Sequence, residues 1–94
     1  MLVLIAYDVS TVEKAGEKRL RQVARACEDY GVRVQKSVFE CRVGQAQWVL
    51  LRERLMSTID PNQDSLRFYF LDADVRVEHH GTAQPPDLEG PLVI

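Results

Sequence analysis

The sequence predicts an α+β fold in which four strands and two helices alternate in the order βαββαβ. Three observations predict it: an apolar N-terminal run, two segments with helical spacing of apolar residues, and a segment between them whose period-2 alternation slips once. The 94 residues allow one domain, and 46% hydrophobic with 28% charged residues is an ordinary globular composition. We therefore expect one small domain with a thin core.

The first strand is predicted over residues 2–9, where the run Leu-Val-Leu-Ile-Ala-Tyr-Asp-Val is apolar on both faces. Such a run is typical of a strand that is buried from both sides. Asp8 lies near its end, and no other acidic residue precedes Glu13. Functional groups are often exposed where a central strand meets a loop, so Asp8 is the first candidate for chemistry. The alternative is that Asp8 only forms a local turn or caps a helix.

Two helices are predicted, over about residues 16–30 and 45–59. Gly16 makes a start of the first helix at Thr11 doubtful, and Gly31 is expected to end the helix in the left-handed conformation. The spacing of the apolar residues predicts which side chains are buried. In the first helix these are Leu20, Val23, Ala24, Cys27 and Tyr30; in the second they are Trp48, Leu51, Leu55 and Ile59, with Val49 and Met56 beside them.

Residues 32–43 alternate between apolar and polar, but apolar residues change from even to odd positions at Lys36 and Ser37. Such a slip predicts a bulge or tight turn, so this segment should supply two strands. The aromatic-rich residues 65–71 predict the last main strand. The resulting order is that of the ferredoxin-like fold, with a core over residues 1–74 and a tail over residues 75–94.

One sheet face of this fold needs a cover that the two helices do not supply. The first and last strands are apolar on both faces, so a second copy of the chain is the economical cover. The tail alternates at Val75 and Val77 and ends in the apolar residues 91–94. We expect a homodimer in which the tail adds one or two short strands to the edge of the neighbouring sheet.

The charge is unevenly distributed along the chain. Residues 13–42 carry eight basic and five acidic residues, whereas residues 60–94 carry seven acidic and two basic ones. This asymmetry suits a protein with one surface that faces phosphate, although solvated helix faces explain it equally well. Lys18, Arg19 and Arg21 lie early in the first helix, where free backbone N–H groups also favour phosphate. They are the candidate nucleic-acid contacts.

Two cysteines and the absence of long apolar runs bear on the compartment. Cys27 and Cys41 fit no metal or redox spacing and lie in apolar periodic segments, so we expect buried free thiols. Free thiols favour a reducing cytoplasm. No apolar run is long enough to span a bilayer, so we expect no membrane contact.

Several segments carry a resemblance to a known family. These segments are Tyr7-Asp8 at the end of the first strand, Arg33-x-Gln35-x-Ser37-Val38-Phe39-Glu40-Cys41, residues 64–69 and the C-terminal residues 90–94. In them the sequence resembles the second universal CRISPR-associated protein, a small component of spacer acquisition. The linker over residues 71–75 is shorter than is usual in the family.

The resemblance implies a ferredoxin-like homodimer with metal-dependent endonuclease activity on RNA or DNA. It implies Asp8 as the ligand of Mg²⁺ or another divalent cation such as Mn²⁺, with two copies meeting near a two-fold axis. By the same resemblance, Tyr7, Ser10, Arg33 and Phe39 are candidate site residues. Their alternatives are structural: a packed tyrosine, a turn serine, a solvated arginine and a core or interface aromatic.

The resemblance also implies assembly with a CRISPR-associated integrase. A non-catalytic alternative follows, in which the dimer binds duplex DNA and bridges integrase subunits. A small-molecule regulatory module or an RNA-recognition domain could use the same fold. The strands lack the Gly-aromatic signature of RNA-recognition domains, so that alternative is disfavoured.

Overall fold

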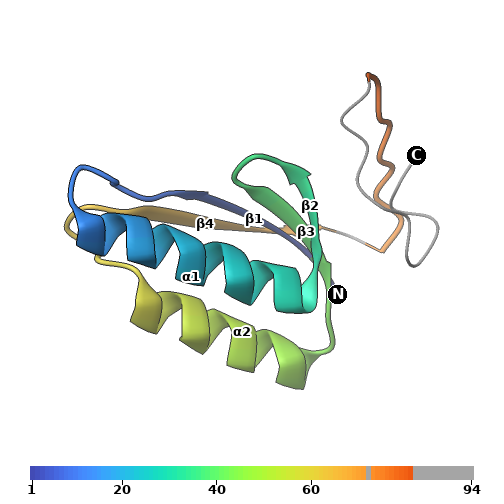
Figure 1. The fold of residues 1–94 in the computed structure, drawn as a ribbon. Helices are drawn as coiled ribbons and strands as arrows, with labels where there is room; N and C mark the ends of the chain where they lie inside the picture. The colour runs from blue at the N-terminus through green and yellow to red at the C-terminus, as the bar shows by residue number, and fades with distance from the viewer. Residues whose placement is uncertain (72, 82–94) are drawn as a thin grey trace.

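The computed structural model describes residues 1–71 and 73–81. Its elements are β1 (Leu2–Asp8), α1 (Lys14–Tyr30), β2 (Val32–Gln35), β3 (Val38–Arg42), α2 (Gln45–Thr58) and β4 (Ser65–Leu71). The strands form one sheet in the order β2-β3-β1-β4, and every neighbouring pair is antiparallel. Both helices cover the same face of the sheet (Figure 1). The predicted α+β class and βαββαβ order are confirmed.

β1 is the central strand that organises the core. It pairs with β3 on one side and β4 on the other. Val3 and Ile5 have no exposed surface, and Tyr7 is buried with them beneath the helices. Their neighbours in this core include Val23, Cys27, Phe39, Cys41, Leu51 and Leu55. The stripe predicted for the first helix therefore does face the sheet.

The opposite face of the sheet is not covered by either helix (Figure 1). The alternate residues Leu2, Leu4 and Ala6 of β1 point to it, because successive strand residues face opposite sides. In register beside them lie the apolar or aromatic residues Val38, Tyr69 and Leu71 and the charged residues Glu40, Arg42 and Arg67. The central strand is therefore apolar on this face, as the sequence predicted, whereas its neighbouring strands add charged residues to it.

The slip in the period-2 pattern corresponds to both of the features it predicted. Lys36 and Ser37 form a turn between β2 and β3. The pairing of the two strands also shifts register between Arg33 and Gln35. The turn brings Ser37 next to β1, where its carbonyl oxygen accepts a hydrogen bond from the Tyr7 backbone N–H at 3.1 Å.

The prediction for Gly31 was wrong, and the first helix begins two residues earlier than predicted. α1 begins at Lys14, so Gly16 lies inside its first turn, where an added Cβ would overlap the backbone carbonyl of Ser10. Gly31 is extended, with φ −157° and ψ −168°, and is not left-handed. A Cβ there would overlap the Cys41 sulfur, so Gly31 is needed for close approach of the chain to β3.

The inner face of α2 was predicted in part. Trp48, Leu51 and Leu55 are buried as expected, and the Trp48 ring meets the Phe68 ring edge-on with centroids 4.8 Å apart. Val49 and Met56, however, are about half exposed, at 55% and 48%. They flank the buried line but turn outward.

The tail was predicted to form short strands. Residues 73–81 form neither helix nor strand within this single chain. The strand predicted at Val75 and Val77 is thus not formed here, and its pairing with a second chain stays a prediction. The apolar residues 91–94 lie outside the described residues. Across the described part of the chain, no helix combines the length and apolar character needed to cross a membrane.

Candidate active site at the end of the first strand

Asp8 is the last residue of β1 and is exposed. Its register partner on β4 is Ser65, the first residue of that strand. Strand alternation directs its side chain to the uncovered face of the sheet, the same face as Leu4 and Ala6. Among the described residues, no hydrogen bond or ion pair involves the Asp8 carboxylate. The carboxylate is therefore available to a ligand.

Tyr7, Phe39 and Arg33 form a stack on the opposite, helix-covered face. The Tyr7 and Phe39 rings are stacked at 6.2 Å between centroids and 23° between planes. The Arg33 guanidinium carbon lies 4.9 Å from the centroid of the Phe39 ring. Phe39 has no exposed surface, so in this structure it supports the strand and does not face a substrate. The structure thus separates these three residues from the Asp8 side chain.

Arg33 also holds the turn that lies beside Tyr7. Its Nη1 donates a hydrogen bond to the carbonyl oxygen of Lys36 at 3.0 Å. Its Nη2 lies 3.7 Å from a carboxylate oxygen of Glu28. Together with the bond from the Tyr7 N–H to Ser37, these contacts fix the turn against the end of β1. Arg33 therefore helps to hold this turn in place beside β1.

The Tyr7 hydroxyl is not poised for proton transfer. Burial raises its pKa above the ordinary value of 10, and the Arg33 guanidinium opposes that rise. The hydroxyl therefore stays protonated near neutral pH. The same holds for the thiols of Cys27 and Cys41, whose pKa burial raises to about 12. Both cysteines are free and buried, as predicted, and neither is an activated nucleophile.

Asp64 is the centre of a hydrogen-bond network next to the candidate site that sequence reasoning missed. Its carboxylate accepts hydrogen bonds from the Ser10 N–H at 3.0 Å and the Asp60 N–H at 2.8 Å. Arg19 adds two more, from Nε at 2.8 Å and Nη2 at 3.2 Å. The side chain has no exposed surface. Asp64 therefore ties the loop after Asp8 to α1 and to the loop before β4.

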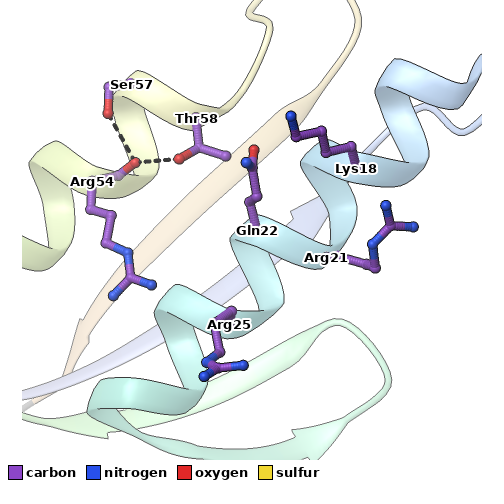
Figure 2. A pocket seen from close by; sticks show the side chains of 7 residues that line it. All are labelled: Lys18, Arg21, Gln22, Arg25, Arg54, Ser57 and Thr58. Carbon is purple, nitrogen blue, oxygen red and sulfur yellow. Dashed lines mark hydrogen bonds between the residues drawn. The ribbon is translucent and has the colours of Figure 1, made fainter.

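These contacts divide the three basic residues that were predicted to bind nucleic acid. The Arg19 side chain is only 16% exposed, and its guanidinium bonds to Asp64. Its hydrogen bonds give it a structural role. Lys18 and Arg21 are exposed and line an open groove between the helices (Figure 2). They remain the accessible cations near the start of α1.

The donors for a metal ion are few in one chain. The part of the chain that the structure describes contains no group of three or more His, Cys, Asp and Glu side chains that could hold an ion. Asp8 offers one available carboxylate. Mg²⁺ keeps several waters and accepts as few as one or two carboxylates, so Asp8 fits as its ligand if a second copy supplies another.

Glu40 is a buried acidic residue on the sheet face that the helices do not cover. It lies opposite Leu4 on β3, is 7% exposed, and its Oε1 has no hydrogen-bond partner among the described residues. Burial raises the pKa of this carboxyl, and Arg42 opposes the rise. A carboxyl whose folded pKa lies above its unfolded value costs stability once pH exceeds the unfolded value of about 4.5.

We therefore expect Glu40→Gln to stabilise the protein at pH 7 by about 1 kcal/mol, because an amide costs less to bury than a charge. The gain should shrink as pH falls through the raised folded pKa toward 4.5, because the native carboxyl takes up its proton before the unfolded one does. Thermal unfolding of both proteins from pH 7.5 to 4.5 measures this. Glu53→Gln on the exposed side of α2 is the matched control. A lower melting temperature for Glu40→Gln would contradict the expectation and reveal a donor from a second chain.

The structure places the protein in the class of small ferredoxin-like α+β proteins, with an exposed carboxylate at the end of the central strand and a first helix rich in basic residues. The family described as CRISPR associated protein Cas2 matches residues 1–78. The chain belongs to this family, and the resemblance inferred from the sequence is confirmed.

Named relatives align with the whole or nearly the whole length of this chain. The CRISPR-associated endoribonuclease Cas2 of Chlorobaculum tepidum is 56% identical over 96 residues and covers all of both chains. The CRISPR-associated endonuclease Cas2 of Halalkalibacterium halodurans is 53% identical over 99% of each. The crystal structure of Streptococcus pyogenes Cas2 at pH 6.5 superposes with a TM-score of 0.76 at 53% identity, covering 86% of this chain and 100% of that one.

Proposed function

We propose that this protein is a divalent-metal-dependent endonuclease that cleaves phosphodiester bonds of RNA or DNA during CRISPR spacer acquisition. The observation that carries the proposal is the exposed Asp8 carboxylate, which no described residue engages. A bound Mg²⁺ would neutralise charge that develops on the phosphate and would lower the pKa of a bound water. The names of the relatives, endoribonuclease and endonuclease, support this activity.

The active form is proposed to be a homodimer. Its support is the apolar face formed by Leu2, Leu4, Ala6 and Leu71, which neither helix covers. Asp8 points to this same face, so covering it with a second copy would bring two carboxylates toward one axis. The tail over residues 75–94 is proposed to add strands to the neighbouring sheet.

The residues around Asp8 are assigned supporting roles. Arg33, Phe39 and Tyr7 are proposed to hold the end of β1 through their stack. Ser10 is proposed to fix the following loop through its backbone N–H, which bonds to Asp64. None of the four has to touch the substrate in this proposal.

An adaptor function is the second candidate, in which the dimer bridges subunits of a CRISPR-associated integrase. The observation that favours it is the exposed apolar surface of α2, where Val49 and Leu50 are 55% and 63% exposed. Exposed apolar patches mark protein contacts. We also place the protein in the reducing cytoplasm, which suits the free thiols of Cys27 and Cys41.

Metal dependence tests the proposed activity. Purified protein should cleave labelled RNA or duplex DNA when Mg²⁺ or Mn²⁺ is present, and a chelator should reduce cleavage to background. The physical reason is that one carboxylate per protomer, without a metal, offers no means to neutralise the phosphate. Cleavage that persists in the chelator at the same rate would contradict the proposal. If neither Mg²⁺ nor Mn²⁺ supports cleavage, the nuclease proposal is wrong and the adaptor function replaces it.

A further inference from the structure

The Asp64 carboxylate lies beside the segment of backbone that carries Asp8. In sequence, Asp64 immediately precedes Ser65, the register partner of Asp8 on β4. In space, its Oδ1 accepts a hydrogen bond from the N–H of Ser10, two residues beyond Asp8. We propose that Asp64 is a positioning residue: by clamping the backbone at Ser10, it fixes the direction in which the Asp8 carboxylate meets a divalent cation. This inference deepens the proposed function and rests on it.

The direction of the Asp8 side chain depends on its backbone alone. Asp8 is the last residue of β1 and is exposed, and no described residue makes a hydrogen bond or ion pair with its carboxylate. Its neighbours Tyr7 and Val9 are both buried in the core. They anchor the chain beneath the helices, and strand alternation turns Asp8 away from them. The Asp8 carboxylate is therefore only as well placed as the backbone on its two sides is fixed.

The backbone is held on both sides of Asp8. Before it, the N–H of Tyr7 donates a hydrogen bond to the turn between β2 and β3 at 3.1 Å. After it, the N–H of Ser10 donates to Asp64 Oδ1 at 3.0 Å. The carbonyl group of Ser10 lies against Gly16 of α1, where an added Cβ would overlap it. Ser10 is therefore held from two sides, by a carboxylate and by a helix backbone, although it lies beyond the end of the strand.

Asp64 is itself fixed well enough to orient another group. Its side chain has no exposed surface, and both of its oxygens accept a hydrogen bond from Arg19, at 2.8 and 3.2 Å. The Asp60 N–H adds a third bond at 2.8 Å. A guanidinium that bonds both oxygens fixes the plane of a carboxylate, and the opposite charges make such bonds strong. Because it is buried and engaged by these donors and by Ser10, Asp64 positions the site and is not itself available as a metal ligand.

Orientation of the carboxylate matters more here than in a site with many ligands. The described part of one chain holds no group of three or more His, Cys, Asp and Glu side chains that could bind an ion. A misplaced Asp8 carboxylate could therefore not be compensated by a neighbouring ligand of the same chain. Partners that orient metal ligands typically change metal affinity about 10- to 100-fold when they are removed. Asp64 acts through the backbone, so we expect an effect at the lower end of this range.

The first measurement follows the clamp without metal. In the intact protein with chelator, Asp64→Ala removes the acceptor of the Ser10 N–H. Asp29→Ala is the matched control, because Asp29 also accepts a 2.8 Å bond from an arginine but lies at the other end of α1. Hydrogen exchange of single amides, measured by NMR, should show the Ser10 amide exchanging at least about tenfold faster in Asp64→Ala. The Tyr7 amide, bonded on the other side of Asp8, is the internal reference and should stay protected.

The second measurement is the affinity for Mn²⁺ alone, without nucleic acid. Electron paramagnetic resonance follows the free ion as it is titrated into wild-type protein and variants. Asp64→Ala should raise the dissociation constant about tenfold, whereas Asp29→Ala should leave it unchanged. Val43→Ala, at a buried residue beside the opposite end of β1, controls for lost stability and should bind as the wild type does. Asp8→Asn should abolish the binding and so identify the site.

The possible results decide different parts of the proposal. If Asp64→Ala binds Mn²⁺ as tightly as the wild type, the positioning role is wrong and Asp64 only stabilises the fold. If Asp64→Ala does not fold, Arg19→Gln takes its place, because it removes the two charged donors that orient the carboxylate. Arg19→Gln should weaken Mn²⁺ binding at least about threefold, and unchanged binding would overturn the inference. Wild-type protein that binds no Mn²⁺ would sink the nuclease proposal but not the clamp, which unchanged exchange of the Ser10 amide in Asp64→Ala would sink by itself.

Discussion

Asp8→Asn is expected to reduce metal-stimulated cleavage at least 100-fold. The substitution keeps the size of the side chain and removes the charge that would hold the cation. A factor of 100 corresponds to about 2.7 kcal/mol of lost transition-state stabilisation, which is within what one metal-binding carboxylate supplies. The measurement is the single-turnover cleavage rate with saturating Mg²⁺. The rate constant should fall at every substrate concentration, because the loss affects the chemical step.

The fold should tolerate this substitution. Asp8 is exposed, and its carboxylate makes no hydrogen bond or ion pair with a described residue, so the substitution removes no internal hydrogen bond. Melting temperature and molecular mass in solution should match those of the wild type. Asp74→Asn, an exposed position after β4 at the other end of the sheet, is the control and should cleave normally. If Asp8→Asn cleaves at the wild-type rate, Asp8 is not the metal ligand.

Asp64→Asn is expected to have the largest effect on stability. The carboxylate accepts four hydrogen bonds, two of them from Arg19, and an amide presents only one acceptor oxygen. The NH₂ group would face donors that it cannot bond. We expect a loss of about 2–3 kcal/mol in the free energy of unfolding, measured by chemical denaturation at pH 7.

The pH dependence should separate this effect from general damage. Hydrogen bonds from Arg19 lower the pKa of Asp64 below its ordinary 3.8, assisted by the backbone N–H groups of Asp60 and Ser10. A carboxyl with a lowered folded pKa contributes stability above its unfolded pKa and loses it as pH falls. The gap between wild type and Asp64→Asn should therefore narrow below about pH 4. A gap that stays constant down to pH 2 would contradict the role of the charge; Glu53→Gln on exposed α2 serves as the control.

The fold could be predicted because its signals are local. The apolar run of β1 and the slip at Lys36 and Ser37 are readable within a few residues, and the structure confirms both. The conformation of Gly31 could not be predicted from local sequence. Gly31 lies against the Cys41 sulfur of β3, and no local pattern indicates such a close approach. Val49 and Met56 were misplaced because α2 carries apolar residues around most of its circumference.

The candidate site could be predicted only where one residue acts alone. Asp8 stands out at the end of its strand, whereas Asp64 gains its role from Arg19, 45 residues away along the chain. The division between Arg19 and its neighbours Lys18 and Arg21 has the same origin. The sequence shows three basic residues in the first turns of the helix. Only tertiary contacts decide that Arg19 is paired with Asp64, whereas Lys18 and Arg21 stay accessible. A motif that paired an arginine early in the first helix with the aspartate before the last strand could have found this link.

The uncovered sheet face has a consequence for how much working protein a cell contains. If a second chain covers Leu4 and Ala6, as proposed, association and folding become linked, and mass action makes the melting temperature rise with protein concentration. Dilution would then dissociate the dimer and expose the apolar strand residues to solvent. Expression level would set not only the amount of this protein but also the share of it that is competent.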